Sequence, residues 1–156
     1  MAHELRTGGY GASDDPTWID ESVAHGFLAR SHWAAGMPVE VMRKSFEHSL
    51  CISARALREG EAREMVGFAR LVTDRSTFAY LCDVFVLEEH RGRGVSLLLM
   101  DCVMSHPDLQ GLRRFVLSTK DAHGIYRRYG FGGVRYPDRY MEIFDPELYL
   151  KAERRG

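Results

Sequence analysis

The stretch FAYLCDVFVLEEHRGRGVSLLL, residues 78–99, predicts a buried strand, a glycine-rich turn and a helix in direct succession. Residues 78–87 are almost continuously apolar apart from Asp83, which is typical of a central strand covered on both faces. Apolar residues then recur at helical spacing from Val95 to Val103, until Pro107 ends the run. The strand therefore leads through Arg91-Gly92-Arg93-Gly94 directly into the N-terminus of a helix.

The sequence before this stretch predicts two helices followed by a β-hairpin. Gly36 and Pro38 interrupt the helical spacing of apolar residues and separate the two helices. Two apolar segments then flank a charged loop, a pattern that favours antiparallel strands. The expected bounds are Asp20 to the break at Gly36 and 39–50 for the helices, 51–57 and 65–73 for the strands, and 58–64 for the loop.

The sequence after the stretch predicts a strand, a helix and two short final strands. Residues 115–117 form a short apolar segment, and Asp121 is expected to cap a helix that runs through Tyr129. The final strands are expected around 133–136 and 140–144. This order of elements implies an α+β fold in which helices cover the faces of a mixed sheet.

Length and composition fit a single globular domain. The chain has 156 residues, of which 45% are hydrophobic and 28% charged. We expect the domain to span 17–150, with a mobile lead-in over 1–16 and a short tail over 151–156. Gly, Ser and Asp concentrate over 7–16, and a short first strand before them is left open. The lead-in is expected to carry little function.

Charge and cysteine content exclude several classes of protein. Lys and Arg total 21 against 22 Asp and Glu, a balance that argues against a nucleic-acid partner. No apolar run could span a bilayer and the first residues lack a signal-peptide core, so we expect a cytoplasmic protein without a membrane partner. Cys51, Cys82 and Cys102 lie in apolar segments without CxxC spacing, so buried thiols are expected and no metal is implied.

The turn Arg91-Gly92-Arg93-Gly94 has the properties of a diphosphate cradle. Glycines allow backbone N–H groups to approach an anion at the positive end of a helix dipole. Arg91 and Arg93 could add charge-assisted hydrogen bonds to phosphate oxygens. The alternative is a tight turn with solvated arginines, because short glycine motifs often occur without a ligand.

Two motifs in this order resemble the GNAT (Gcn5-related N-acetyltransferase) family. The segment 86–99 resembles its acyl-CoA motif, [RQ]-x-x-G-x-[GA], with Arg91 and Gly94 in place and Ser96 where the family prefers Gly or Ala. The segment AHGIYRRYGF, 122–131, resembles the later motif A-x-x-L-Y-x-x-x-G-F. The resemblance covers about 65–145. It implies a GNAT-like, mixed and mostly antiparallel sheet flanked by helices on both faces.

The resemblance implies acetyl-CoA as cosubstrate and no metal. An amine would attack the thioester directly in a ternary complex, without a covalent acyl-enzyme. Tyr126 matches the tyrosine that protonates the departing sulfur, although a ring that only packs is the alternative. Thr119 stands where the family often has Asn beside the pantetheine arm. The expected cofactor-binding residues are Val84, Phe85, Val86, Arg91, Gly92, Arg93, Gly94, Ser96, Thr119 and Tyr126.

Asp83 is a candidate general base that no motif assigns. A carboxylate in an apolar strand is costly unless it is paired or protonated, and a structural hydrogen bond is at least as good an explanation. Trp33, Tyr80 and Asp83 could form an aromatic and acidic site for a cationic acceptor. Weaker catalytic candidates are His25, His32, His123, Glu142 and, as a substitute donor, Tyr129.

Two functions from different classes follow. The first is an acetyltransferase acting on a small-molecule amine. The second is a non-catalytic acyl-CoA-binding sensor or interaction module, for which Ser96 and Thr119 would be the signs of lost turnover. The presence of Tyr126 favours the enzyme. A homodimer remains open.

Overall fold

The computed structural model describes residues 1–57 and 64–155. Within them, six strands form a single sheet in the order β1-β2-β3-β4-β5-β6, and every neighbouring pair is antiparallel except β5 and β6, which are parallel. The strands are β1 (Glu4–Thr7), β2 (Tyr10–Ser13), β3 (Leu50–Ala56), β4 (Glu64–Thr73), β5 (Phe78–Val86) and β6 (Arg114–Leu117). The mixed, mostly antiparallel sheet is confirmed.

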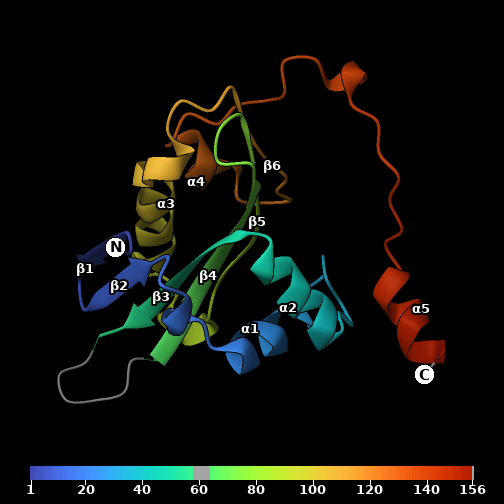
Figure 1. The fold of residues 1–156 in the computed structure, drawn as a ribbon, viewed down its shortest axis with the longest axis horizontal. Helices are drawn as coiled ribbons and strands as arrows, with labels where there is room; N and C mark the ends of the chain where they lie inside the picture. The colour runs from blue at the N-terminus through green and yellow to red at the C-terminus, as the bar shows by residue number, and fades with distance from the viewer. Residues whose placement is uncertain (58–63, 156) are drawn as a thin grey trace.

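Helices cover both faces of this sheet (Figure 1). On one face, α3 packs against an apolar cluster that includes Ile52, Leu71 and Leu81. On the other face, residues of α1 and α2 pack around Phe68 and Phe85. The helices are α1 (Glu21–Leu28), α2 (Val39–Glu47), α3 (Val95–Ser105), α4 (His123–Arg127) and α5 (Leu148–Arg155). Because β5 contributes to both clusters, the expectation that this strand is covered on both faces is confirmed.

The prediction of a mobile lead-in over 1–16 is wrong for most of that segment. β1 and β2 extend the sheet, and Tyr10 and Ala12 are buried in the core. Gly8 and Gly9 form the turn between these strands with φ of 56° and 80°. The glycines that suggested a loop therefore make a hairpin turn, and each flanking strand has only four residues, too few for a clear alternating pattern.

Several other boundaries differ from expectation. The first helix ends at Leu28, and the hairpin loop predicted at 58–64 lies almost entirely outside the described residues. Asp121 does not cap the following helix: the N-cap residue of α4 is Ala122, whose N–H donates to Thr119 Oγ1 at 3.0 Å. The short strands expected around 133–136 and 140–144 are not formed within the described chain, and α5 occupies much of the expected tail.

Candidate active site

The parallel pairing between β5 and β6 covers only the first half of β5. Its register pairs run from Phe78 with Arg114 to Leu81 with Leu117. β5 continues to Val86 and remains paired there with β4. The second half of β5, which contains Val84, Phe85 and Val86, therefore extends beyond β6. The two strands therefore separate before the residues of β5 that were expected to bind acyl-CoA.

A β-bulge lies in β5 where this separation begins. On the β4 side, Phe68 pairs with Phe85 but Arg70 pairs with Cys82, so β5 has one extra residue between these pairs. Asp83 has φ of 51°, a left-handed conformation that is uncommon for a residue other than glycine. The bulge thus changes the direction of the Asp83 side chain within an otherwise regular strand.

Asp83 is buried and accepts hydrogen bonds on both carboxylate oxygens. Trp33 Nε1 donates to Oδ1 at 2.9 Å, and Arg70 Nε donates to Oδ2 at 2.7 Å. Arg70 also donates from Nη1 to Ser49 Oγ at 3.0 Å. We call Asp83, Arg70 and Trp33 the Asp83 cluster. The ion pair with Arg70 compensates for the desolvation free energy of a carboxylate in the core. Whether Asp83 acts in catalysis or only stabilises the fold, its carboxylate already has two hydrogen-bond partners.

The turn before α3 has an open backbone. Gly92 and Gly94 have φ of 72° and 83°, and a Cβ on either residue would meet no atom within 4 Å. Gly94 is the N-cap residue of α3, and within the described residues no side chain caps this helix terminus. Arg91 and Arg93 are both exposed beside it. The first-turn N–H groups and two guanidinium groups are therefore available to an anion.

Two contacts fix the residues between the end of β5 and this turn. His90 is buried, and its Nδ1 lies 2.9 Å from the hydroxyl of Tyr10 on β2. Arg91 Nε donates to the carbonyl of Val86 at 3.1 Å. These contacts fix the turn relative to the sheet, which is the preorganisation that a rigid anion site needs.

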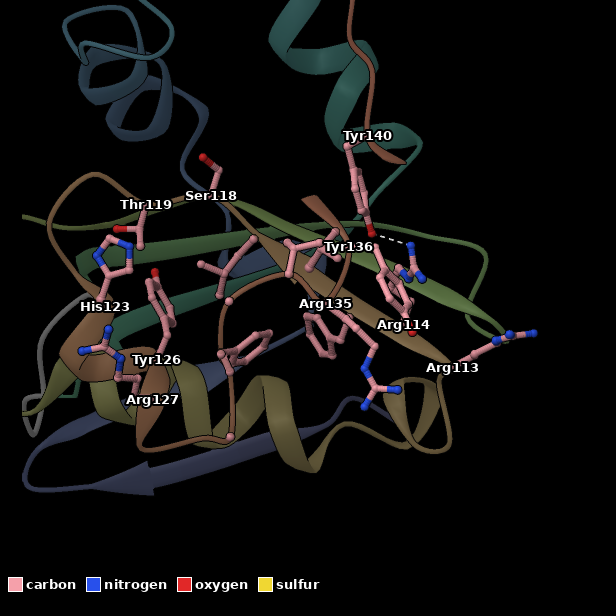
Figure 2. Close-up of a pocket in the computed structure, with 18 of the residues that line it drawn as sticks. Arg113, Arg114, Ser118, Thr119, His123, Tyr126, Arg127, Arg135, Tyr136 and Tyr140 are labelled. Carbon is pink, nitrogen blue, oxygen red and sulfur yellow. Dashed lines mark hydrogen bonds between the residues drawn. The ribbon is translucent and has the colours of Figure 1, made fainter. Parts of the chain in front are cut away.

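A cavity of about 1210 Å³ lies beside β6 and α4. Figure 2 shows Ser118, Thr119, His123, Tyr126 and Arg127 at one end of it, with the Tyr126 hydroxyl on the same side as Thr119. The Tyr126 ring packs edge to face against Phe131, with ring centroids 6.1 Å apart. Burial raises the pKa of Tyr126, so its phenol remains protonated at neutral pH and can act as a proton donor.

Tyr129 has a different environment from Tyr126 although it follows on the next turn. Its hydroxyl donates to Asp101 Oδ1 at 2.8 Å and lies 3.2 Å from the carbonyl of Leu97. Burial and the hydrogen bond to Asp101 raise the pKa of Tyr129 to about 12. Tyr129 therefore ties the end of α4 to α3, and its hydroxyl is already occupied.

His25 and His32 contact neighbouring groups, and the Cys82 thiol is unsuited to act as a nucleophile. Burial raises the pKa of the Cys82 thiol to about 12, which disfavours the thiolate. His25 Nε2 lies 2.8 Å from the carbonyl of Met37, and His32 packs edge to face on Trp33. Within the described residues, no group of three or more His, Cys, Asp or Glu side chains could hold a metal ion, and no helix could span a membrane.

Comparison with known proteins places this arrangement in a family. The pattern described as the acetyltransferase (GNAT) family matches residues 14–131, which is more than half of the chain. The chain belongs to the GNAT acetyltransferase family. A predicted acetyltransferase of Gibberella zeae is 30% identical to it over 137 residues, covering 76% of each chain. The resemblance seen in the two motifs is confirmed, and with it the class of enzyme.

Solved GNAT structures support the same fold. A predicted GNAT acetyltransferase from Xanthomonas campestris pv. campestris is 46% identical, with a TM-score of 0.85 over 92% of this chain and 99% of the other. Glucosamine-6-phosphate N-acetyltransferase from Arabidopsis thaliana is 12% identical, with a TM-score of 0.56 over 93% of this chain and 99% of the other. At that identity the second similarity concerns the fold alone.

The sequence suggested that Asp83 and Trp33 belong to one site, and the structure brings them into contact. The sequence analysis did not identify Arg70, the second partner of Asp83, although the sequence contains a pattern that points to it. Arg70 is the single charged residue between Met65 and Thr73, as Asp83 is between Phe78 and Leu87. Two isolated opposite charges in adjacent apolar strands of a GNAT sheet favour a buried ion pair. Tyr80, the third member of the expected group, is exposed on β5.

Proposed function

We propose that the protein transfers an acetyl group from acetyl-CoA to the amine of a small molecule, by direct attack in a ternary complex. The observation that supports this most strongly is the glycine-built N-terminus of α3, which no side chain of the described residues caps and which follows a strand only half paired with β6. This geometry suits a diphosphate at the helix terminus and an extended arm beside the free edge of β5.

The residues of the turn fit the diphosphate of acetyl-CoA. Gly92 and Gly94 leave open space where a side chain would stand, and Arg91 and Arg93 supply positive charge. Ser96, in the first turn of α3, adds a hydroxyl and is only half-buried. Main-chain groups of Val84, Phe85 and Val86, with Thr119 on the opposite side, would hold the pantetheine arm. When bound, acetyl-CoA supplies an acetyl thioester and a thiolate leaving group.

Tyr126 is the proposed general acid. Its phenolic proton would pass to the sulfur of the departing CoA, which avoids releasing a bare thiolate in a partly buried site. The raised pKa of Tyr126 keeps this proton in place until the sulfur becomes basic. Phe131 fixes the ring from its edge, so the hydroxyl has a defined direction. The backbone N–H groups at the free edge of β5 would polarise the thioester carbonyl.

Trp33 and Asp83 are the proposed acceptor side of the site. The hydrogen bond from Trp33 Nε1 to Asp83 Oδ1 orients the indole of Trp33, a residue that is 44% exposed, so part of its surface is available to an amine. Asp83 would accept a proton from the amine only by giving up its hydrogen bond from Trp33 or from Arg70. The proposed acceptor is therefore a small amine with an apolar or aromatic body, which can use the Trp33 surface.

Measuring CoA release from acetyl-CoA across amines, arylamines and amino acids tests this function. We expect turnover with a subset of small amines and formation of the N-acetyl product in equal amount. Hydrolysis of acetyl-CoA without an acetylated product, for every amine tested, would contradict acetyl transfer. Binding of CoA without any turnover would instead support the non-catalytic acyl-CoA-binding module.

A further inference from the structure

The side chain of Arg91 connects the turn before α3 with the end of β5. Its backbone opens the turn, three residues before the N-cap residue Gly94. Its side chain reaches back to the strand, where Nε donates to the carbonyl of Val86 at 3.1 Å. One guanidinium group is therefore near both regions that the proposed function assigns to acetyl-CoA, the diphosphate turn and the strand edge.

The carbonyl of Val86 lies on the unpaired edge of β5. In an antiparallel pair, successive residues point their N–H and C=O groups alternately toward the partner strand and away from it. The N–H of Leu87 donates to the carbonyl of Val66 on β4 at 2.8 Å, so the main-chain groups of Leu87 face β4. Those of Val86, one residue earlier, therefore face the side of β6. Since β6 pairs with β5 only as far as Leu81, the Val86 groups lie beyond the paired part of the edge.

The guanidinium of Arg91 covers part of this edge. An extended ligand that adds alongside a strand pairs with the outward N–H and C=O groups of that strand. At Val86 the outward C=O already accepts a hydrogen bond from Arg91 Nε. A pantetheine arm that pairs with this carbonyl must therefore displace the guanidinium.

The backbone of the turn has other contacts that hold it in place. Glu88–His90 form a short 3-10 helix, and the N–H of Arg91 donates to the carbonyl of Glu88 at 3.2 Å. The buried ring of His90 contacts the hydroxyl of Tyr10. Arg91 itself is exposed. Its side chain can therefore leave Val86 while the backbone of the turn keeps its position.

A diphosphate in the turn is a stronger partner for Arg91 than the Val86 carbonyl. Hydrogen bonds from a guanidinium to an anionic phosphate are stronger than those to a neutral carbonyl. The N-terminus of α3 favours an anion directly beside Arg91. A diphosphate bound there would draw the guanidinium away from the strand, and the Val86 carbonyl would become available to an N–H group of the arm. Binding in one region would thus raise the affinity of the other.

We propose that Arg91 is a positioning residue that couples the two regions: its guanidinium moves from the Val86 carbonyl to the diphosphate and so uncovers the β5 edge for the pantetheine arm. The inference rests on the proposed use of acetyl-CoA. It adds a basis for selectivity, because an acyl thioester that lacks a diphosphate meets a covered edge. Acyl-CoA carries the group that uncovers it.

Two fragments of CoA test the two regions separately. ADP carries a diphosphate but no arm, and pantetheine carries the arm but no phosphate. The Kd of pantetheine is measured by NMR titration of the native protein, with and without saturating ADP. We expect ADP to lower this Kd at least about fivefold, which is within the usual range of coupling between two ligands. An unchanged Kd, with both fragments bound, would refute the coupling.

Arg91→Ala removes the guanidinium from the edge and from the turn. We expect weaker binding of ADP, about two- to tenfold tighter binding of pantetheine alone, and no remaining effect of ADP on pantetheine. A purely structural role for Arg91 predicts weaker binding of both fragments, so tighter binding of pantetheine is the diagnostic result. Equal or weaker binding of pantetheine to Arg91→Ala would overturn the proposal.

Arg93→Ala is the matched control. It removes an equal charge from the same turn and leaves the bond between Arg91 and Val86 in place. ADP should bind this variant more weakly than the native protein, but saturating ADP should still tighten the binding of pantetheine. Loss of the coupling in Arg93→Ala as complete as in Arg91→Ala would show that charge alone is responsible and would refute a specific role for Arg91.

The Nε–H resonance of Arg91 follows the guanidinium directly in the isotope-labelled native protein. It is identified by its absence from the spectrum of Arg91→Ala, and we expect ADP to shift it. If CoA and both fragments fail to bind, the proposed acyl-CoA site is wrong, and the coupling with it. If CoA binds but ADP leaves this resonance unchanged, the coupling alone is refuted and the proposed function stands.

Discussion

The Asp83 cluster, centred on β5, and the turn Arg91–Gly94, which comes soon after β5, are built in opposite ways. The turn consists of four consecutive exposed residues and offers main-chain N–H groups. The cluster is centred on the buried Asp83–Arg70 ion pair and joins side chains from β4, β5 and the connection between α1 and α2. A site made from consecutive backbone can lose its ligand while the fold survives, whereas a site made from distant buried charges also contributes to the stability of the fold.

The largest change in turnover is expected for Tyr126→Phe, which tests the chemical step and not the binding of CoA. Tyr126→Phe removes the phenolic proton but keeps the ring that packs on Phe131, so turnover should fall about 10²- to 10⁴-fold while CoA binding stays nearly unchanged. Steady-state kinetics and a CoA titration measure the two quantities separately. Unchanged turnover, with the chemical step rate-limiting, would reduce Tyr126 to a packing residue.

Asp83→Asn tests the buried side of the comparison. The amide keeps an acceptor for Trp33 but leaves the Arg70 guanidinium without its ionic partner, so the free energy of unfolding should fall by about 3–5 kcal/mol. Urea unfolding measures this. The matched control is Asp108→Asn, which breaks the exposed pair with Arg75 and should cost about 1 kcal/mol or less.

The same variant also tests the proposed role of Asp83 in catalysis. At a temperature where Asp83→Asn is fully folded, a positioning role predicts a changed Michaelis constant for the amine and little change in turnover. A general-base role predicts lower turnover.

In the urea unfolding experiment, a loss of stability in Asp83→Asn no larger than that in Asp108→Asn would contradict the stability prediction. It would show that the buried ion pair contributes no more to the free energy of unfolding than an exposed one.

Gly94→Glu tests the exposed side of the comparison. A carboxylate at the N-terminus of α3 should repel the diphosphate, so CoA should no longer stabilise the variant, whereas CoA at 100 times its Kd stabilises the native protein by about 2.7 kcal/mol. Thermal unfolding with and without CoA provides the measurement. Gly111→Glu is the control, because Gly111 also has a positive φ, 71°, and open space at its Cβ but lies outside the turn. Equal stabilisation of both variants by CoA would refute the cradle.

The difference between the two regions also explains what the sequence could predict. The turn and α3 were predictable because strand, glycines and helical spacing are consecutive, and the structure places Gly94 at the N-cap of α3. Arg70 was missed because its partner lies 13 residues away on another strand, where only the pairing register brings the two together. The cap of α4 was assigned to Asp121 on propensity alone, but the backbone places Thr119 Oγ1 within reach of the Ala122 N–H.

The chain after α4 shows a further limit of sequence reasoning. Strands were expected around 133–136 and 140–144, but within the described residues no strand forms there. α5 was not predicted, since its apolar residues follow Pro146 within a short, strongly charged segment. Secondary structure that depends on distant contacts is therefore the part that local patterns leave undetermined.

The smallest effect is expected for Tyr129→Phe, which sharpens the contrast between the two tyrosines. The variant loses the hydrogen bonds to Asp101 and the Leu97 carbonyl, so the free energy of unfolding should fall by about 1 kcal/mol, while turnover stays near the native value.

The pH dependence of stability gives a second test of the Tyr129 contact. The pKa of Tyr129 in the folded protein, about 12, lies above its ordinary value of 10.0, so between these two pH values the folded protein keeps the phenolic proton while the unfolded chain releases it. Stability from Tyr129 is therefore complete below about pH 10 and is lost as the pH rises towards about 12. Urea unfolding between about pH 8 and about pH 11 should show the native protein losing stability faster than Tyr129→Phe. Parallel pH profiles for the two proteins would mean that the Asp101 contact does not hold the phenolic proton, and turnover reduced as strongly as in Tyr126→Phe would assign the donor role to Tyr129 instead.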